Sequence, residues 1–104
     1  MDKKAVEIAK DFMGRVGKDF RISRGILFGS RARDDYLLDS DIDLLIVSED
    51  FKGIFFTERM SRMYDFWDYG IPLETLCYTP EEFEKKRMQI GTVREAVKEG
   101  IEII

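Results

Sequence analysis

Residues 25–47 read Gly-Ile-Leu-Phe-Gly-Ser-Arg-Ala-Arg-Asp-Asp-Tyr-Leu-Leu-Asp-Ser-Asp-Ile-Asp-Leu-Leu-Ile-Val. This segment holds two apolar runs, residues 26–28 and 44–47, separated by a polar connection. Short apolar runs bounded by turn residues predict β-strands. The second run is apolar on both faces, so we expect a central strand that is covered on both sides. The first strand, expected over residues 22–28, ends at a Gly-Ser pair, and the second begins at two aspartates.

The two aspartates that open the second strand, Asp41 and Asp43, are separated by a single isoleucine. Residues i and i+2 of a strand point to the same face of a sheet. Two carboxylates held on one face repel each other unless a cation lies between them. Asp41 and Asp43 are therefore candidate ligands of a divalent metal ion.

The Gly-Ser pair at the end of the first strand is a candidate phosphate site. Gly29 lets the backbone turn tightly and approach a ligand, and Ser30 suits the N-cap of a short helix through Arg33. A helix N-terminus presents unpaired N–H groups that can hold a phosphate. On its own the pair is more typical of an ordinary strand-to-helix turn, because glycine turns are common. The acidic pair nearby reverses that weighting.

The composition limits the class of protein. A chain of 104 residues that is 44% hydrophobic and 37% charged predicts one globular domain over residues 1–104. No apolar run approaches the roughly 20 residues that span a bilayer, and the N-terminus does not read as a signal peptide. Cys77 is the single cysteine, which excludes an internal disulfide. We therefore expect a cytoplasmic protein with no membrane partner.

The charged residues limit the chemistry. The net charge of −4 argues against a protein that mainly coats nucleic acid, where a basic face is expected. A local basic patch at Arg31 and Arg33 keeps nucleic acid as the weaker acceptor candidate. There is no histidine, which excludes Ser-His-Asp triads and the usual zinc sites. Catalysis must then use carboxylates, hydroxyls and metal ions.

Apolar residues at helical spacing predict two helices, over residues 5–16 and 57–69. Their apolar stripes are expected to face the core. The charged residues of the second helix are expected on a solvated face, although Arg59 or Arg62 could meet an acidic partner.

The last part of the chain predicts one strand and two helices. Residues 73–78 alternate as a third strand, and Thr-Pro-Glu-Glu at 79–82 predicts a capped helix start. A final helix over residues 92–98 is expected to end at a glycine, followed by a short apolar tail at 101–104.

Glu74 is the one charged residue of the predicted third strand. Burying a charge is costly unless it is paired. From the residues alone, an exposed edge position is the simpler interpretation. The other interpretation is a third carboxylate of the metal site.

The Gly29-Ser30 pair followed by Ser40-Asp-Ile-Asp-Leu resembles the signature of the polymerase-beta nucleotidyltransferase superfamily. The short chain is similar to its minimal nucleotidyltransferase (MNT) branch. The resemblance implies an α/β (α+β) fold, with a small mixed sheet and packed helices. Two positions depart from the family pattern, because the family usually has glycine at Asp34 and aspartate at Glu74.

The resemblance also implies site residues, two Mg²⁺ ions and ATP as the substrate. It assigns metal binding and catalysis to three carboxylates, those of Asp41, Asp43 and Glu74. It assigns nucleotide binding to Gly29, Ser30, Arg31, Arg33 and Ser40. Gly29 and Ser30 would hold the β- and γ-phosphates, and either arginine could add contacts.

The implied reaction is transfer of a nucleoside monophosphate, AMP from ATP, to a protein hydroxyl. The chain is too short to carry its own acceptor-binding domain, so the acceptor is expected on another protein. MNT proteins are often antitoxins paired with helical HEPN toxins, which implies a separate HEPN-type partner. The alternative is a binding module with the same fold, which masks a toxin or binds nucleotide with little turnover. A homo-oligomer is compatible with either.

Overall fold

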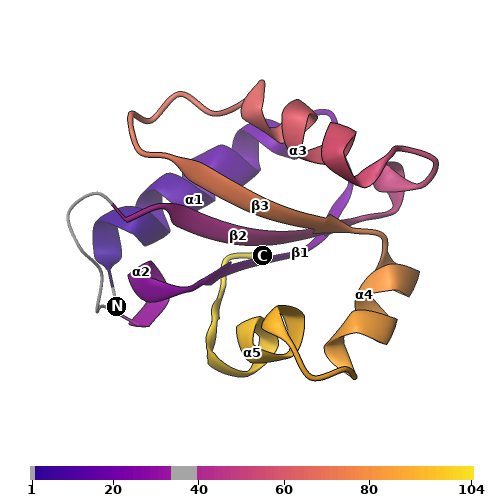
Figure 1. The fold of residues 1–104 in the computed structure, drawn as a ribbon. Helices are drawn as coiled ribbons and strands as arrows, with labels where there is room; N and C mark the ends of the chain where they lie inside the picture. Colours follow the sequence, from indigo (N-terminus) through magenta and orange to yellow (C-terminus); the bar gives the residue numbers. More distant parts are fainter. Residues whose placement is uncertain (1, 34–39) are drawn as a thin grey trace.

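The computed structural model describes residues 2–33 and 40–104, and a mixed sheet forms its centre (Figure 1). The described strands are β1 (Ile22–Phe28), β2 (Ile42–Ser48), β3 (Leu73–Tyr78) and β4 (Ile101–Glu102). Their order across the sheet is β3-β2-β1-β4. β1 runs antiparallel to β2 and to β4, whereas β2 and β3 run parallel. The predicted fold class is confirmed, and β1 and β3 have their predicted bounds.

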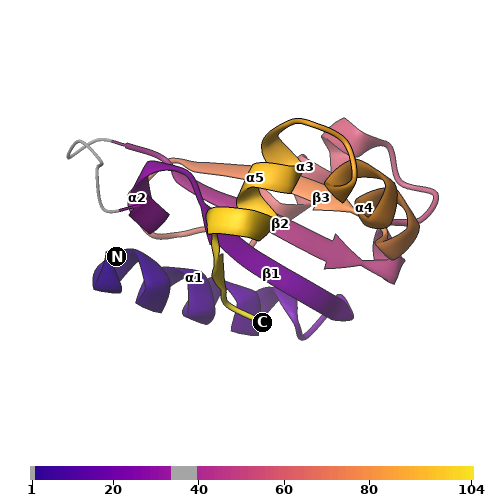
Figure 2. The same cartoon turned by 90° about the horizontal axis from the view of Figure 1, so that it is seen from below.

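Helices cover both faces of the sheet. α1 (Lys3–Val16) lies on one face, and α4 (Pro80–Arg87) and α5 (Thr92–Glu99) lie on the other (Figure 2). α3 (Phe56–Tyr64) lies beside β3 and contributes Met63 to the core under α1. None of these described helices is long and apolar enough to cross a membrane.

α1 forms where the apolar periodicity predicts it. Asp2 caps the helix by accepting a hydrogen bond from the backbone N–H of Ala5 at 3.0 Å. The buried stripe contains the six predicted residues: Ala5, Val6, Ala9, Phe12, Met13 and Val16. The helix ends before Gly17, as expected. Burial of this stripe against the sheet supplies most of the stability of such a helix.

α3 is shorter than the predicted helix over residues 57–69, because it ends at Tyr64. A turn follows the helix, and the indole N–H of Trp67 donates to the carbonyl oxygen of Ile71 at 2.6 Å. This bond holds the Trp67 ring edge-on to Phe12, with 5.0 Å between the ring centroids. The apolar pattern therefore placed Met63 in the core correctly, but Tyr64 of the same stripe is exposed, and the second half of the segment is a turn instead of a helix.

Arg59 of α3 is buried and meets the acidic Glu82, as the alternative for Arg59 or Arg62 allowed, so it does not lie on the solvated face expected for the helix's charges. Only 5% of Arg59 is exposed. Its guanidinium donates to the carbonyl oxygens of Ile54 and Cys77 at 2.8 and 3.1 Å, and to Glu82 Oε1 at 2.6 Å. The parallel crossover from β2 to β3 places this side of α3 against the end of β3 and the start of α4.

The C-terminal part of the chain forms largely as predicted. Thr79 and Glu82 form the expected capping box at the start of α4. α5 ends before Gly100, again as predicted. The apolar tail, however, adds β4 to the edge of β1, where Ile26 pairs with Glu102. A strand this short is set by its tertiary partner, so no local pattern predicted it.

Candidate active site

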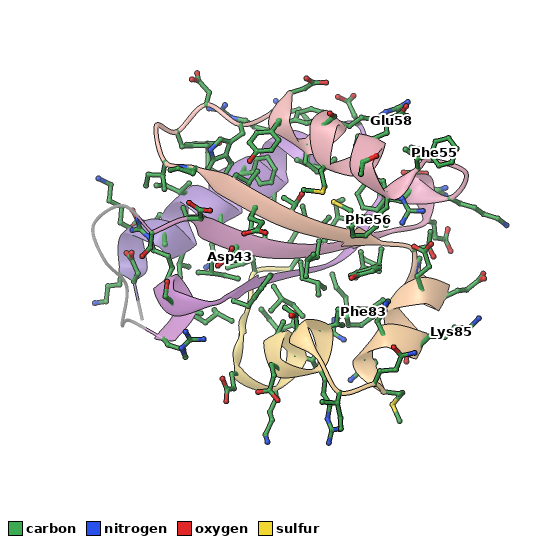
Figure 3. The ribbon with its side chains drawn as sticks, in the orientation of Figure 1. Asp43, Phe55, Phe56, Glu58, Phe83 and Lys85 are labelled. Carbon is green, nitrogen blue, oxygen red and sulfur yellow. The ribbon has the colours of Figure 1, made fainter. Side chains whose placement is uncertain are left out.

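Two carboxylates meet at one end of the sheet. The strand register pairs Phe28 of β1 with Asp43 of β2, and Asp43 with Glu74 of β3. Because β2 and β3 are parallel and start at the same edge, Asp43 and Glu74 lie directly side by side. Both lie on the face that α4 and α5 cover, and Figure 3 shows Asp43 at the start of β2.

Gly29 closes one side of this group. Its φ of +76° lies in the left-handed region that favours glycine. A Cβ at this position would lie 2.3 Å from Asp43 Oδ2, which is a clash. Glycine therefore lets the turn after β1 approach the Asp43 carboxylate, and no larger residue fits this turn without displacing that carboxylate.

The carboxylates carry negative charge that the described protein groups do not fully offset. Burial, followed by the charges of Glu74 and Asp41, raises the pKa of Asp43 to about 6. The charge of Arg33 acts in the opposite direction. The order of these causes means that Asp43 ionises reluctantly in this site. A bound cation would remove that penalty.

The carboxylates have the right chemistry for a hard cation such as Mg²⁺, but their positions suit such an ion only in part. Carboxylate oxygens are the ligands that Mg²⁺ prefers. Asp43 and Glu74 are adjacent, while Asp41 lies exposed just before β2. Within residues 2–33 and 40–104, no three acidic or sulfur side chains already converge as a metal site. Asp41 is close enough for its charge to act on the pKa of Asp43, and the expected sharing of one cation by all three carboxylates stays a prediction.

Arg31, one of the two arginines expected to contact phosphate, is bound within the chain. Its side chain is buried, and Nη1 lies 3.0 Å from Asp2 Oδ2. Its Nη2 and Nε donate to the carbonyl oxygen of Ser40 at 2.8 and 3.2 Å. Arg31 therefore joins the start of α1 to the chain that enters β2. Ser40 takes part in this arrangement through its backbone carbonyl.

The other predicted phosphate-binding residues stay near the carboxylates. α2 (Ser30–Arg33) follows directly after Gly29, and Ser30 is its first residue instead of its N-cap. The backbone N–H of Arg33 donates to the carbonyl oxygen of Gly29 at 3.3 Å. Arg33 is exposed and close enough to act on the pKa of Asp43. The departure from the family pattern at Asp34 lies outside the described residues.

Two hollows lie near the end of β1, and Asp43 lines the first of them. One, of about 420 Å³, has Asp43 and Glu74 at one end and the connection from α4 to α5 as its wall. The other, of about 300 Å³, lies on the Gly29 and Arg33 side. Phe28 and Thr92 line both. The α4–α5 connection therefore forms part of the site, although no local motif in the sequence marked it.

Comparison with known proteins identifies the family. The model of the family described as "Nucleotidyltransferase domain" matches residues 7–102 of this chain. The chain belongs to this family. The resemblance inferred from the Gly29-Ser30 and Asp41-x-Asp43 pattern is thereby confirmed.

Individual relatives agree with the family assignment. "Putative protein adenylyltransferase MJ0604" of Methanocaldococcus jannaschii is 35% identical over 74% of this chain and 76% of its own length. A second protein of that organism, "Putative protein adenylyltransferase MJ0141", is 28% identical over 94% and 97%. A crystal structure of a "putative nucleotidyltransferase" from Sulfolobus solfataricus is 29% identical. It superposes with a TM-score of 0.64, covering 79% of this chain and 73% of that one.

Proposed function

We propose that this nucleotidyltransferase transfers AMP from ATP to a hydroxyl of a partner protein, with Mg²⁺ at the carboxylates. The observation that carries the proposal is the Asp43–Glu74 pair, held beside Gly29 at the open end of a hollow. The names of the two Methanocaldococcus relatives, which both specify a protein adenylyltransferase, support AMP and a protein acceptor.

Each group in the site has a role in this reaction. Gly29 and Ser30 bind the β- and γ-phosphates, and Arg33 offsets part of their charge. Asp43, with Asp41 and Glu74, would hold the metal ions. Bound Mg²⁺ would neutralise the phosphates and carboxylates and stabilise the charge that develops on the α-phosphate. Positioning and electrostatics then supply most of the rate enhancement.

The reaction is one in-line displacement. The acceptor oxygen forms a bond to the α-phosphorus as the bond from that phosphorus to the bridging oxygen breaks. Pyrophosphate leaves with the electron pair of the broken bond. The proton of the acceptor hydroxyl passes to a carboxylate oxygen of Glu74, which lies on the hollow side of the site.

A HEPN-type protein with an acceptor tyrosine is the partner we propose, and co-expression provides the test. The two proteins are purified together and incubated with ATP and Mg²⁺, and intact-mass spectrometry follows the partner. We expect one or more AMP adducts with the natural chain. The doubly substituted Asp41→Asn/Asp43→Asn chain should form the same complex without an adduct.

The same experiment separates the enzyme from a masking module. A complex that forms equally with both chains and carries no adduct in either would support masking and contradict transfer. An adduct on nucleic acid, detected by labelling with ATP radioactive at the α-phosphate, would instead replace the protein acceptor.

A further inference from the structure

We propose that the acceptor enters along a groove over the outer strand β3, as an extended, acidic segment of the partner protein. This inference rests on the proposed transfer to a protein. It adds the route to the site and the chemistry of the segment that takes it.

The groove consists of two hollows that join. The hollow of about 420 Å³ begins at Asp43 and Glu74, and one of about 500 Å³ continues from it toward the start of α3. Tyr78, Lys86 and Gln89 line both. Since Glu74, Leu76 and Tyr78 alternate on one face of β3, the strand itself forms the floor. The groove therefore connects the carboxylates with the far end of β3.

The rims of the groove are apolar and exposed. Ile90 at the carboxylate end is 92% exposed, and Phe56 at the far end is 39% exposed. The Phe56 ring leans on Tyr78, with 5.5 Å between the ring centroids. Apolar side chains that border a hollow are typical of a surface that binds another molecule. They suit the apolar side chains of a polypeptide better than a nucleic-acid backbone.

The charge of the groove changes sign along its length. The carboxylates make one end negative, whereas Lys85 and Lys86 border the far end. No ion pair involves either lysine among the residues that the structure describes. Glu82 does not offset them, because its carboxylate is bound to Arg59. A segment with its acceptor hydroxyl at one end and acidic residues at the other complements both ends.

The length of β3 sets the spacing in that segment. Glu74 and Tyr78 are four residues apart, which is about 13 Å along a strand. An extended peptide covers the same distance in about four residues. The acidic residues of the partner are therefore expected about four to six residues from the acceptor hydroxyl.

Titration of the ¹⁵N-labelled chain with defined peptides tests the groove. The probe is a seven-residue peptide with tyrosine at one end, three leucines in the middle and three acidic residues at the other end. It is made in both chain directions, with a matched peptide carrying lysines in place of the acids. Mg²⁺ and a non-hydrolysable ATP analogue are present. We expect saturable amide shifts that map to Phe56, Tyr78 and Gln89 with an acidic peptide only.

Two pairs of variants make the test specific. Phe56→Ser should weaken binding of the acidic peptide about tenfold, as loss of an aromatic anchor does. Phe55→Ser is the control, since Phe55 is 84% exposed but does not line either hollow (Figure 3). Lys86→Glu should weaken binding of the acidic peptide and improve binding of the lysine peptide. Lys98→Glu on α5, outside both hollows, should change neither.

Several results would overturn the groove. These are absence of saturable binding, shifts elsewhere on the surface, equal loss with Phe55→Ser, or the same shifts from an oligouridine decamer or from the ATP analogue alone. AMP transfer to the tyrosine, measured with ATP by mass spectrometry, separates this inference from the proposed function. Binding in the groove without transfer leaves the groove and refutes the transfer. AMP transfer that is unchanged by Phe56→Ser and Lys86→Glu would support the transfer and refute the groove.

Discussion

Two pairs of charged side chains lie at opposite ends of β3. One pair joins a cation to an anion, and the other joins two anions. At the far end, the Arg59 cation meets the Glu82 anion at 2.6 Å and also satisfies the carbonyl oxygens of Ile54 and Cys77. At the near end, Asp43 and Glu74 place two anions on neighbouring strands. The first pair is balanced by its own two charges, and the second carries negative charge that a bound cation would offset.

The difference shows that charged residues of this chain stabilise the fold at one end of β3 and form the candidate active site at the other. A buried ion is tolerated when its partner and its hydrogen bonds are complete, as they are around Arg59. An anionic pair costs stability until a ligand neutralises it, and burial together with the charges of Glu74 and Asp41 raises the pKa of Asp43 to about 6. The chain therefore keeps a site that costs stability and that a metal ion and a nucleotide would use.

The largest expected effect breaks the anionic pair. Asp43→Asn should lower AMP transfer by about three orders of magnitude, comparable with loss of a principal electrostatic group in other enzymes. The same change should raise the midpoint of thermal unfolding at pH 8 without metal, because it removes a repulsive charge. Steady-state kinetics and calorimetric melts measure the two effects. A variant that loses activity and also melts at a lower temperature would contradict this account of the site.

The Asp41-x-Asp43 part of this site could be predicted from the sequence because its signals are local, whereas Glu74 was added to it only by the family resemblance. Alternation and turn residues located β1 and β3, and the aspartates mark the start of β2. Once the strands are parallel and adjacent, the register places Asp43 beside Glu74. Whether Asp41 joins them depends on a side chain outside the strand, which the alternation rule does not govern.

The balanced pair could not be predicted, because its signals are not local. Arg59 has the spacing of a solvated helix position, and only the crossover between β2 and β3 places it against Glu82. Arg31 poses the same problem, since its partner Asp2 lies 29 residues away in the chain. An arginine in sequence shows its charge but not its partner.

The second prediction breaks the balanced pair. Arg59→Met removes the donor to the buried carbonyl oxygen of Cys77 and to the part-buried one of Ile54, and should lower the free energy of unfolding by about 2 to 3 kcal/mol. Arg62→Met is the control. Arg62 pairs with Glu58 on the exposed side of the same helix, so its loss should cost less than about 0.5 kcal/mol. Urea denaturation of both variants gives the values, and similar losses would show that the buried contacts add nothing.

A third, smaller effect concerns how Ser30 binds the negative charge of the triphosphate. Ser30→Ala should weaken binding of a triphosphate about tenfold, as expected for one hydrogen bond to a charged group. Ser61→Ala, on the exposed face of α3, should leave the affinity unchanged. Calorimetric titration measures affinity, and a thermal melt measures stability. If Ser30→Ala lowers only the melting temperature, Ser30 supports the turn and not the phosphate.

The last prediction concerns the pH dependence of stability that Asp43 contributes. Its pKa rises from 3.8 to about 6 on folding, so between these values the folded chain binds a proton that the unfolded chain has lost. The free energy of unfolding therefore falls as pH rises through this window. Asp43→Asn removes this contribution and serves as the reference, because other carboxylates, such as Asp50 and Glu82, have lowered pKa values and act at lower pH.

The quantity to measure is the difference in unfolding free energy between the natural chain and Asp43→Asn, from denaturation at several pH values. Without metal, the natural chain should lose stability relative to the variant from about pH 4 to about pH 6, and the difference should then stay constant. Saturating Mg²⁺ should reduce the loss, since a cation favours the ionised carboxylate and binds only the folded pair. A difference that is flat across this window would mean that the Asp43 carboxylate ionises as freely as one in water. The contrast between the two ends of β3 would then be one of geometry alone.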